Sequence, residues 1–415
     1  MITRELQSKY SMCKINSIVN IIFYMFLCLT IIPDLKSITI LYAFIGGLTV
    51  LVLVMGASKE IKKGKNYNKD YVNWVCVFTA YSLCSLVWSS VLATNQISYF
   101  FINLIILVPT SIYVNSLERL MDFLQIIILA TFSMCLFIIL SPDVGLKMAE
   151  GSMRLSSHDG MWNANFIGVC CSVSIIICMY MIKVRNKSKI LYLAAIMIFS
   201  TTVVMTGSRK SVLVIIIGCS LFAVFKQSKS KILYLFGVFF VVLIFYYILM
   251  SVPVLYEFIG VRIDSFLNYF SSQKNVDSST MYRISMIEYG VHWFKIKPIF
   301  GHGMDNFRYL FVDATGRMAY SHNNYIELLV GGGLVGFLLY YCYLYKSTIK
   351  LLRVTNNGSN LVALLLSILI TILCIDVSLV SYNARFVQVV ICLVCCGVNI
   401  SKIRIAAKPI NKKYL

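Results

Sequence analysis

Long apolar runs separated by short polar segments make up most of this chain. Each run is close to the roughly 20 residues that a helix needs to cross the hydrocarbon core of a bilayer. Backbone polar groups find no water there, so such runs can only be helices. The pattern predicts about 12 membrane spans, at residues 15–32, 38–55, 71–92, 97–114, 121–140, 164–182, 190–206, 211–225, 232–250, 324–345, 361–376 and 386–400.

The composition agrees with this pattern. The chain has 415 residues, of which 59% are hydrophobic and 13% charged, and its mean hydropathy is +0.81. The charged share is about half that of a soluble protein. The predicted fold class is therefore an all-α polytopic membrane protein. No small-residue cleavage site follows the run 15–32, so we interpret it as a retained span rather than a signal peptide.

The net charge of +20 would suit a nucleic-acid-binding protein, but the distribution of the charge argues against that class. Most Lys and Arg residues stand in short clusters after even-numbered spans, which is typical of cytoplasmic loops. These clusters are 59–69, 183–189, 226–231, 346–353 and 402–413, together with the basic N-terminus. Both termini are therefore predicted to be cytoplasmic, and nucleic acid is not expected as a partner.

The same pattern divides the chain into three parts. Residues 1–250 form an N-terminal membrane region with nine spans, 251–322 form a large extracytoplasmic loop, and 323–415 form three spans and a basic cytoplasmic tail. Within the loop, the stretch from Ser279 to Pro298 has apolar residues at helical spacing, which predicts a short amphipathic helix. Such a helix would lie on the membrane surface.

The cysteines and histidines do not predict a metal centre or a disulfide framework. The chain has 14 cysteines, and all but Cys13 fall in predicted spans, where cysteine usually serves as a small packing residue. His302 and His322 have no third ligand at a regular spacing, and His158 and His292 have no assigned role. We therefore expect no metal and no cofactor.

Basic residues lie at two places on the predicted outer face, where membrane topology does not require them. The turn "TGSRKS" at Thr206–Ser211 contains Arg209 and Lys210, and the loop helix contains Arg283. Arginine at an interface can simply reach toward lipid headgroups, and an arginine on a surface helix is commonly solvated. The alternative is a diphosphate ligand, because a guanidinium beside a helix start suits phosphate oxygens.

A third group of polar residues stands at the start of the tenth predicted span, in "SHNNYIELLVGGGLVGFLLYY". His322 stands at the membrane boundary, where a neutral imidazole could accept a proton from a hydroxyl. Asn323 and Asn324 could instead act as helix caps, and Glu327 could orient a partner or pair with an arginine. The spacing of Gly332 and Gly336 predicts close helix packing, and the alternative bases on this face are Asp305, Asp313 and Glu288.

The stretch beginning at Ser321, preceded by "PIFGHGMDNF" and by Arg283, resembles the signature of the O-antigen ligase and polysaccharide repeat-unit polymerase superfamily. The segments "TGSRKSVLV" and "MWNANFIGV" resemble its upstream motifs, although Trp162-Asn163-Ala164-Asn165 stands where Asn-Pro-Asn is commoner. The resemblance extends over about Arg154 to Tyr345. It implies a glycosyltransferase that moves a glycan from undecaprenyl diphosphate to an acceptor hydroxyl, outside the cytoplasm, in a bacterial inner membrane.

The resemblance also implies roles for particular residues. Arg209 and Arg283 would bind the diphosphate, and His322 would be the catalytic base. The chain lacks an Asp-x-Asp or Glu-x-Asp metal motif, and arginines in place of a metal fit that absence. Residues that would support this site are Lys210, Asn323, Asn324, Glu327, Asn165 and Arg154.

Three functions remain open at this stage. A polymerase would join lipid-linked repeat units, whereas a ligase would deliver the glycan to a lipid A core or another acceptor; we favour the polymerase because the external region is modest in size. A flippase or other transporter would require a long central cytoplasmic loop and mid-span charges, and the sequence offers neither. Expected partners are the undecaprenyl-diphosphate-linked oligosaccharide, the acceptor, membrane lipids, a flippase and a chain-length regulator.

Overall fold

A computed structural model of the chain describes residues 2–32, 39–89, 91, 94–141, 144–149, 152–157, 163–185, 188–225, 236–237, 239–240, 243, 246–247, 250–260, 278–355 and 359–406. The first part consists of helices α1 (Ile2–Ile31), α2 (Thr39–Lys62), α3 (Lys69–Cys84) with the 3-10 turn η2 (Ser85–Val87), α4 (Thr94–Tyr113) and α5 (Leu117–Leu140). Strands β1 (Val144–Ala149) and β2 (Ser152–Ser157) follow, and then α6 (Ala164–Val184), α7 (Lys189–Met205) and α8 (Arg209–Phe225). The remainder comprises α10 (Pro253–Leu255), the π-helical turn η4 (Tyr256–Gly260), α12 (Ser278–Ile296), α13 (Phe307–Thr315), α14 (Asn324–Thr355), α15 (Asn360–Ile375) and α16 (Arg385–Ala406).

Helices form where the apolar runs predict them, to within a few residues at most ends. The predicted span 232–250 lies largely outside the described residues. Among the residues that the structure describes, four helices are long and apolar enough to cross a membrane, namely those at Ile40–Lys62, Leu117–Leu140, Ala164–Val184 and Asn324–Thr355. Five further apolar helices in this part of the chain are shorter. The chain is thus a helical membrane protein with several spans, and the number of about 12 spans stays a prediction.

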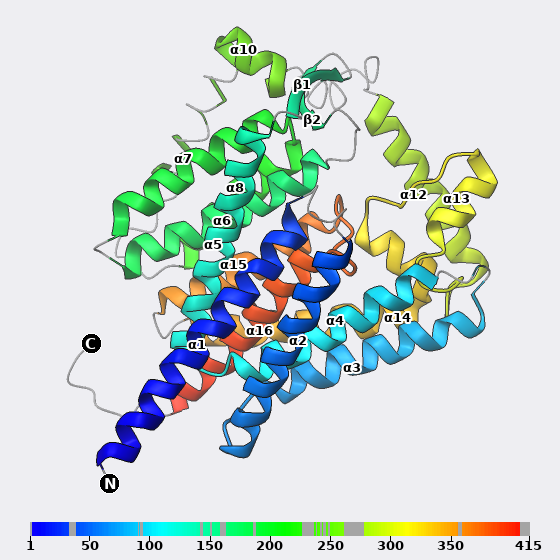
Figure 1. The fold of residues 1–415 in the computed structure, drawn as a ribbon. Coiled ribbons are helices and arrows are strands. Elements are labelled where there is room, and N and C mark those ends of the chain that lie inside the picture. Colours follow the sequence, from blue (N-terminus) through cyan, green and yellow to red (C-terminus); the bar gives the residue numbers. More distant parts are fainter. Residues whose placement is uncertain are drawn as a thin grey trace.

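The segment after α5 contains a feature that the apolar pattern did not indicate. β1 and β2 pair as a short antiparallel hairpin, in which Val144 lies opposite Ser157 and Ala149 opposite Ser152. Figure 1 shows the hairpin beside α10, beyond the ends of α6 and α8. Two short strands give too weak an alternation of polar and apolar residues to be recognised among long apolar runs.

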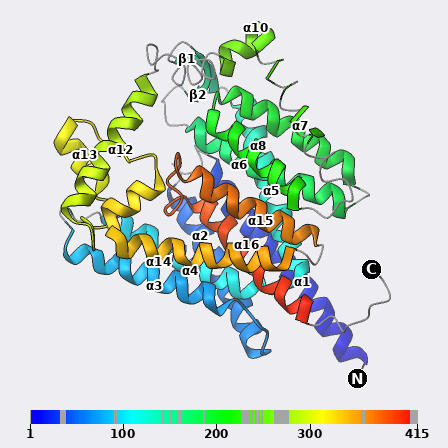
Figure 2. The same ribbon diagram turned by 180° about the vertical axis from the view of Figure 1, so that it is seen from behind.

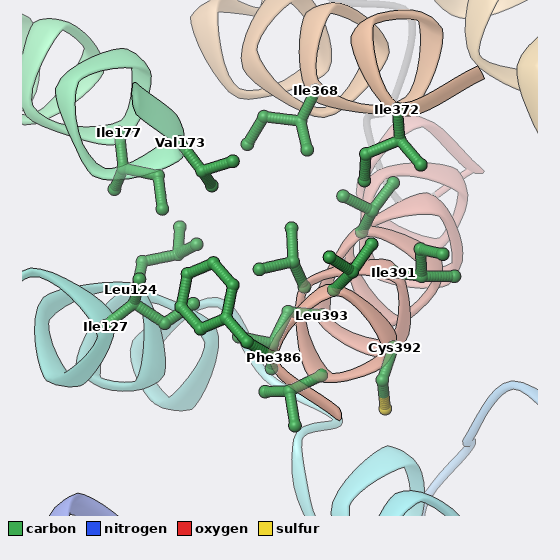
Figure 3. Close-up of a cluster of buried hydrophobic side chains, with 14 of the residues drawn as sticks. Leu124, Ile127, Val173, Ile177, Ile368, Ile372, Phe386, Ile391, Cys392 and Leu393 are labelled. Carbon is green, nitrogen blue, oxygen red and sulfur yellow. The ribbon is translucent and has the colours of Figure 1, made fainter. Parts of the chain in front are cut away.

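One continuous apolar core joins helices from both ends of the chain. Figures 1 and 2 show α6, α7 and α8 on one side of the bundle and α3, α4 and α14 on the other, with α1, α15 and α16 between them. α15 packs against α8 and α6, and most of its side chains are buried. The close-up in Figure 3 shows the centre of this core, formed by Leu124, Ile127, Val173, Ile177, Ile368, Ile372, Phe386, Ile391, Cys392 and Leu393.

The buried cysteines behave as packing residues, as predicted. Cys392 and Cys396 lie in α16, where their thiols approach the carbonyls of Leu107 and Ser111 at 3.6 and 3.8 Å. All cysteines whose side chains the structure describes are free thiols. Hydrogen bonding of a thiol to a helix carbonyl is a weak interaction that fills space without creating a reactive centre.

The bundle has two chemically different ends. At one end, the starts of α8, α14 and α16 meet the end of α15: Lys210 Nζ donates to the Ser378 carbonyl at 2.9 Å, and the Asn324 N–H donates to the Asp376 carbonyl at 2.7 Å. We call this the site end. The opposite end carries the buried Arg119–Glu60 ion pair, with an N–O distance of 3.0 Å.

Two of the predicted cytoplasmic clusters, 59–69 and 346–353, fall at that opposite end. The end of α2 carries Lys59 and Lys62, and the end of α14 carries Arg353. Lys350, near the end of α14, pairs with Asp70 at the start of α3 at 2.7 Å. The site end and the basic clusters are therefore separated by the length of the bundle, which fits the predicted separation of the two membrane faces.

A backbone break in α14 holds the loop that precedes α13. Gly333 has φ 60° and ψ −163°, which interrupts the helix. The freed carbonyls of Val330 and Gly331 accept hydrogen bonds from the N–H groups of His302 and Gly303, at 2.8 and 2.9 Å. A side chain at Gly301 would collide with this same backbone, because its Cβ would lie 2.6 Å from the Gly331 carbonyl oxygen. The glycines thus let two backbones approach closely.

The predicted close packing at Gly332 and Gly336 is confirmed. A Cβ at either position would contact the ring of Tyr81 in α3, at 3.5 and 2.9 Å. The Tyr81 hydroxyl also donates to the carbonyl of Gly332 at 2.5 Å. These glycines join α14 to α3 at the level of the break.

α12 packs on α13 and on the first turns of α14 through one face. Its buried residues Met286 and Trp293 form a small apolar cluster with Phe307, Phe311, Ile326 and Val330. Of the apolar residues at helical spacing in this stretch, Met281, Ile287 and Val291 are exposed on the other side of α12. The proposal that this side rests on the membrane surface stays a prediction.

Candidate functional site

The turn before α8 is fixed by small residues and hydroxyl groups. Gly207 has φ 58°, which lets the chain reverse between α7 and α8. Ser172 of α6 donates to the Ser211 carbonyl at 2.9 Å, and Ser211 Oγ donates to Ser208 Oγ at 2.8 Å. Gly168 of α6 has no room for a side chain against Ser211. This packing sets the position of the two basic residues that open α8.

The two basic residues have different surroundings. Lys210 is only 7% exposed, and its ammonium donates to the Ser378 carbonyl in the loop between α15 and α16. Arg209 is half-buried at the first position of α8. The role of Arg209 as a diphosphate ligand stays a prediction, whereas the charge of Lys210 acts on the histidine described next.

His322 occupies a strained position in the loop before α14. Its φ of 55° lies in the left-handed region, which non-glycine residues adopt only when their surroundings enforce it. Its ring contacts the Tyr320 ring with a centroid distance of 4.1 Å. Its Nδ1 is buried and has no hydrogen-bond partner within the described structure. A buried imidazole nitrogen without a partner is costly, and such atoms are often found where a ligand binds.

Two separate helices, α12 and α8, place positive charges near His322. Burial lowers its pKa, and the positive charges of Arg283 in α12 and Lys210 in α8 lower it further, to about 3. The imidazole is therefore neutral at physiological pH. The sequence-predicted residues His322, Arg283 and Lys210 thus come together at the site end, although they lie far apart in the chain.

Tyr320 and Asn163 extend this group toward α6. Burial raises the pKa of Tyr320, while a hydrogen bond with the Asn163 side chain and the charge of Arg283 oppose the shift. Asn163 also caps α6, since its side chain accepts from the Phe166 N–H at 3.3 Å. Asn165 is half-buried in the first turn of α6. Of the Asn-x-Asn pair, the first asparagine therefore has the contacts that link α6 to the site.

Two acidic residues, Glu327 in α14 and Asp305 before α13, have buried contacts near the loop that carries His322. Glu327, only 2% exposed, accepts from the Ser321 N–H through Oε2 at 2.9 Å, and its Oε1 is buried without a hydrogen-bond partner in the described structure. Asp305, with φ 63°, pairs with Arg308 at 2.6 Å. Burial alone would lower the pKa of Arg308, but Asp305 outweighs it and the pKa is raised. This pairing makes Asp305 a poor free base.

The two asparagines after His322 have structural contacts. Asn323 caps α14, because its Oδ1 accepts from the N–H groups of Tyr325 and Ile326 at 3.0 and 3.2 Å. Asn324 is fully buried, and its Oδ1 accepts from the N–H groups of Ser381 and Tyr382, both at 3.0 Å. Both side chains thus position backbone, Asn323 as the predicted helix cap and Asn324 as a tie to the loop between α15 and α16.

The loop 376–384, between α15 and α16, is a part of the site that sequence reasoning missed. The Ser378 carbonyl of this loop accepts a hydrogen bond from Lys210, and the Ser381 N–H of the loop donates to the Asn324 side chain. The Asp376 carboxylate accepts from Tyr341 at 2.8 Å and from Asn324 at 3.3 Å. The available signal was Asp376 itself, a carboxylate at the end of an apolar run, where it needs buried partners.

The remaining candidates lie elsewhere or have other contacts. His302 is buried, and its Nε2 bonds the Trp293 carbonyl at 2.9 Å, which ties the loop to α12. No group of three or more His, Cys, Asp or Glu residues among those described could hold a metal ion. Asp313 and Glu288 are exposed on α13 and α12. The side chain of Arg154 lies outside what the structure describes.

The buried histidine should make the protein sensitive to acid. The unfolded chain binds a proton on this histidine below a pH of about 6.5, whereas in the folded protein the pKa of His322 is about 3. Between these values the unfolded state binds more protons, so stability falls as the pH is lowered. At pH 5 the cost is about 2 kcal/mol. Unfolding of the detergent-solubilised protein at pH 7.5 and 5 should show a larger loss for the wild type than for His322→Gln; equal losses would contradict this placement of His322.

A comparison with known protein families finds a match in the same region of the chain. Residues 193–341 match the family described as O-antigen ligase, a segment that covers less than half of the chain and contains Arg209, Lys210, Arg283 and His322. No curated protein matches the chain. The segment from α7 to the middle of α14 is therefore similar to the O-antigen ligase family.

Proposed function

We propose that this protein is a membrane glycosyltransferase that polymerises undecaprenyl-diphosphate-linked oligosaccharide repeat units on the extracytoplasmic face of a bacterial inner membrane. The observation that carries the proposal is the convergence of Arg283, Lys210 and a neutral His322 within the segment that matches the O-antigen ligase family. Two cations beside a neutral imidazole suit a reaction with an anionic leaving group and a hydroxyl nucleophile.

The two cations would bind the diphosphate of the donor. The Arg283 guanidinium can donate two parallel hydrogen bonds to phosphate oxygens, and the Lys210 ammonium can exchange the Ser378 carbonyl for a phosphate oxygen. Arg209, at the start of α8, would act on the same diphosphate from the helix N-terminus. With this set of cations, the proposed enzyme stabilises the leaving diphosphate without a metal.

His322 would act as the base for the acceptor hydroxyl. Its nitrogen takes the hydroxyl proton while the acceptor oxygen forms a bond to the anomeric carbon of the donor sugar. The bond from that carbon to the diphosphate oxygen breaks, and the electron pair leaves on the lipid diphosphate. Tyr320, in contact with the ring, and Glu327, bound to the Ser321 N–H, would hold the imidazole in place.

Binding of the donor would change the pKa of His322 and therefore its strength as a base. In the empty site, burial together with the charges of Arg283 and Lys210 holds the pKa of His322 at about 3, so the imidazole is a very weak base. A bound diphosphate would offset both positive charges and raise that pKa, while burial would still keep it below the ordinary value of about 6.5. The imidazole is then a stronger base when the leaving group is in place. This coupling would protect the site from unproductive proton transfer.

A ligase is the second candidate, because the same chemistry serves any acceptor hydroxyl. The choice of polymerase rests on the modest external region, in which α12 and α13 pack tightly on α14 through their apolar cluster. A flippase that supplies the donor and a chain-length regulator are the partners that a polymerase would need. Both termini would face the cytoplasm, since the basic clusters lie opposite the site end.

Reconstitution of the purified protein in liposomes with a lipid-diphosphate-linked repeat unit tests the proposal. A polymerase lengthens the glycan on the lipid and gives a ladder of products. A ligase gives product only when an acceptor such as lipid A core is added. Movement of the substrate across the bilayer without any change in glycan length would contradict both enzyme activities and indicate a transporter.

A further inference from the structure

A second polar group lies near the proposed diphosphate site, where α13 and α14 begin. It consists of Asp305, Arg308 and Glu327, and we call it the Arg308 group. Asp305 Oδ1 accepts from Arg308 Nη2 at 2.6 Å, and Glu327 Oε2 accepts from the Ser321 N–H at 2.9 Å. Both carboxyl groups are buried. The proposed reaction assigns no role to Asp305 or Arg308.

Two buried atoms of this group lack a hydrogen-bond partner among the described residues. Glu327 Oε1 is an acceptor without a donor, and Arg308 Nε is a donor without an acceptor. The two side chains are close enough for their charges to interact: burial lowers the pKa of Arg308, but Asp305 and Glu327 are among the charges that outweigh it. Leaving such atoms unpaired is costly. A neighbouring donor and acceptor therefore indicate a ligand that can both accept and donate.

The Arg308 group and the diphosphate site are neighbours around His322. The charges of Arg283 and Lys210 act on His322. Tyr320 contacts the His322 ring, with centroids 4.1 Å apart. Burial raises the pKa of Tyr320, and the charges of Arg283 and Arg308 both oppose that rise. The phenol of Tyr320 thus lies within electrostatic reach of both groups.

The two substrates of the proposed reaction need different binding groups. The donor has a diphosphate at its reacting end, and the cations Arg283 and Lys210 suit that anion. The reacting end of the acceptor offers only a sugar ring with its hydroxyl groups. When one of these hydroxyls contacts His322, the rest of the ring must lie against neighbouring side chains. A ring held in this way keeps the reacting hydroxyl in line with the base.

We propose that the Arg308 group binds a hydroxyl of the acceptor sugar, on the same ring as the hydroxyl that His322 deprotonates. The inference rests on the proposed function. Glu327 Oε1 accepts from the bound hydroxyl, and Arg308 Nε–H donates to its oxygen. A hydroxyl can do both, whereas a phosphate oxygen only accepts and an ammonium only donates. The sugar enters past Arg308, whose side chain is 31% exposed, because Glu327 is shielded from solvent.

Two substitutions remove the two proposed contacts one at a time. Glu327→Gln can keep the backbone hydrogen bond through its carbonyl oxygen, while its NH₂ replaces the free acceptor with a donor. Arg308→Lys keeps a positive charge beside Asp305 but lacks the Nε–H. The matched controls are Asp313→Asn and Arg317→Lys, at exposed positions in α13 and just after it.

The assay uses the lipid-linked repeat unit as donor and the octyl glycoside of the repeat-unit oligosaccharide as acceptor. This glycoside has no diphosphate, so it cannot act as a donor. We expect the KM for the glycoside to rise at least about 10-fold in both variants, since each loses a hydrogen bond to a charged group. The KM for the donor should stay unchanged, and both controls should match the wild type.

A series of glycosides that keep the reacting hydroxyl and lack one other identifies the contact. One member should lose about the same factor with the wild type and lose nothing further with Glu327→Gln. A raised KM for the donor instead would place the donor sugar in the Arg308 group and overturn the inference. A lower kcat with both KM values unchanged would overturn it too, because Glu327 would then only support the His322 loop.

Unchanged kinetics in both variants would also overturn the inference and leave a water molecule as the partner of the two atoms. Binding of the octyl glycoside is followed in parallel by saturation-transfer NMR, which needs no turnover. Weaker binding in both variants, without glycan transfer by the wild type, would remove the proposed enzyme and leave the sugar subsite standing. Transfer with normal glycoside binding in both variants would remove the subsite and leave the enzyme.

Discussion

His322→Gln is expected to lower the rate of glycan transfer by roughly 10²- to 10⁴-fold, which is the contribution of a general base. Glutamine fills a similar volume but cannot accept and then release the acceptor proton. The effect should appear in kcat, because the substitution leaves both cations of the diphosphate site in place. Turnover is measured with purified protein and a lipid-diphosphate-linked repeat unit.

The matched control is His292→Gln, which replaces an exposed histidine on α12. This variant should retain wild-type turnover. A His322→Gln enzyme with full activity and normal insertion into the membrane would remove His322 as the base, and Glu327 would become the next candidate.

The pH dependence of the wild type provides an internal check on this prediction. In the free protein the pKa of His322 is about 3, so kcat/KM should show no inflection from this group between pH 5 and 7. In the donor complex the pKa should rise above its value in the free protein while staying below about 6.5, and kcat should fall on the acid side of that raised pKa as the imidazole gains a proton. An acid limb in kcat/KM and none in kcat would contradict the proposed coupling between donor and base.

Arg283→Ala is expected to lower kcat/KM by roughly 10²- to 10³-fold, as the loss of a donor to a developing oxyanion does in other enzymes. Arg283→Lys should recover part of this loss and remain roughly 10-fold impaired, since ammonium lacks the paired donors of guanidinium. Lys210→Gln should act in the same direction, because an uncharged amide can still reach the Ser378 carbonyl but cannot balance a phosphate. Steady-state kinetics with varied donor separates these effects.

Lys295→Gln is the control for charge on α12, because Lys295 is exposed near the end of that helix. It should leave the kinetics unchanged. Arg209→Lys should also impair turnover if Arg209 reaches the diphosphate from the start of α8. Normal kinetics in Arg283→Lys and Arg209→Lys together would argue against a diphosphate site built on guanidinium groups.

The helices of this protein could be predicted from sequence because the bilayer imposes a simple physical rule. A run of apolar residues long enough to cross the hydrocarbon core must be helical, so α5, α6 and α14 begin close to where their runs begin. The same rule does not predict where a helix is interrupted. Gly333 leaves the run of α14 unbroken in sequence while its φ of 60° breaks the helix, and the hydrogen bonds that compensate come from the distant loop at His302.

The site could be predicted only in part. Arg283 and His322 stood out because a charge and an imidazole on an outer loop of a membrane protein have few structural reasons to be there. The local sequence did not reveal that the charge of Lys210 lowers the pKa of His322. That effect depends on which face of α8 packs on the loop 376–384. The contribution of that loop depends on a long-range bond to Asn324, which no local pattern encodes.

The most direct test of the central claim is the structure of the protein with bound undecaprenyl diphosphate. The account predicts that the two phosphates lie between Arg283 and Lys210, within hydrogen-bonding distance of both, with the His322 ring beside the outer phosphate. Phosphates bound at the opposite, basic end of the bundle, or Arg283 and Lys210 too far apart to contact one diphosphate, would contradict it.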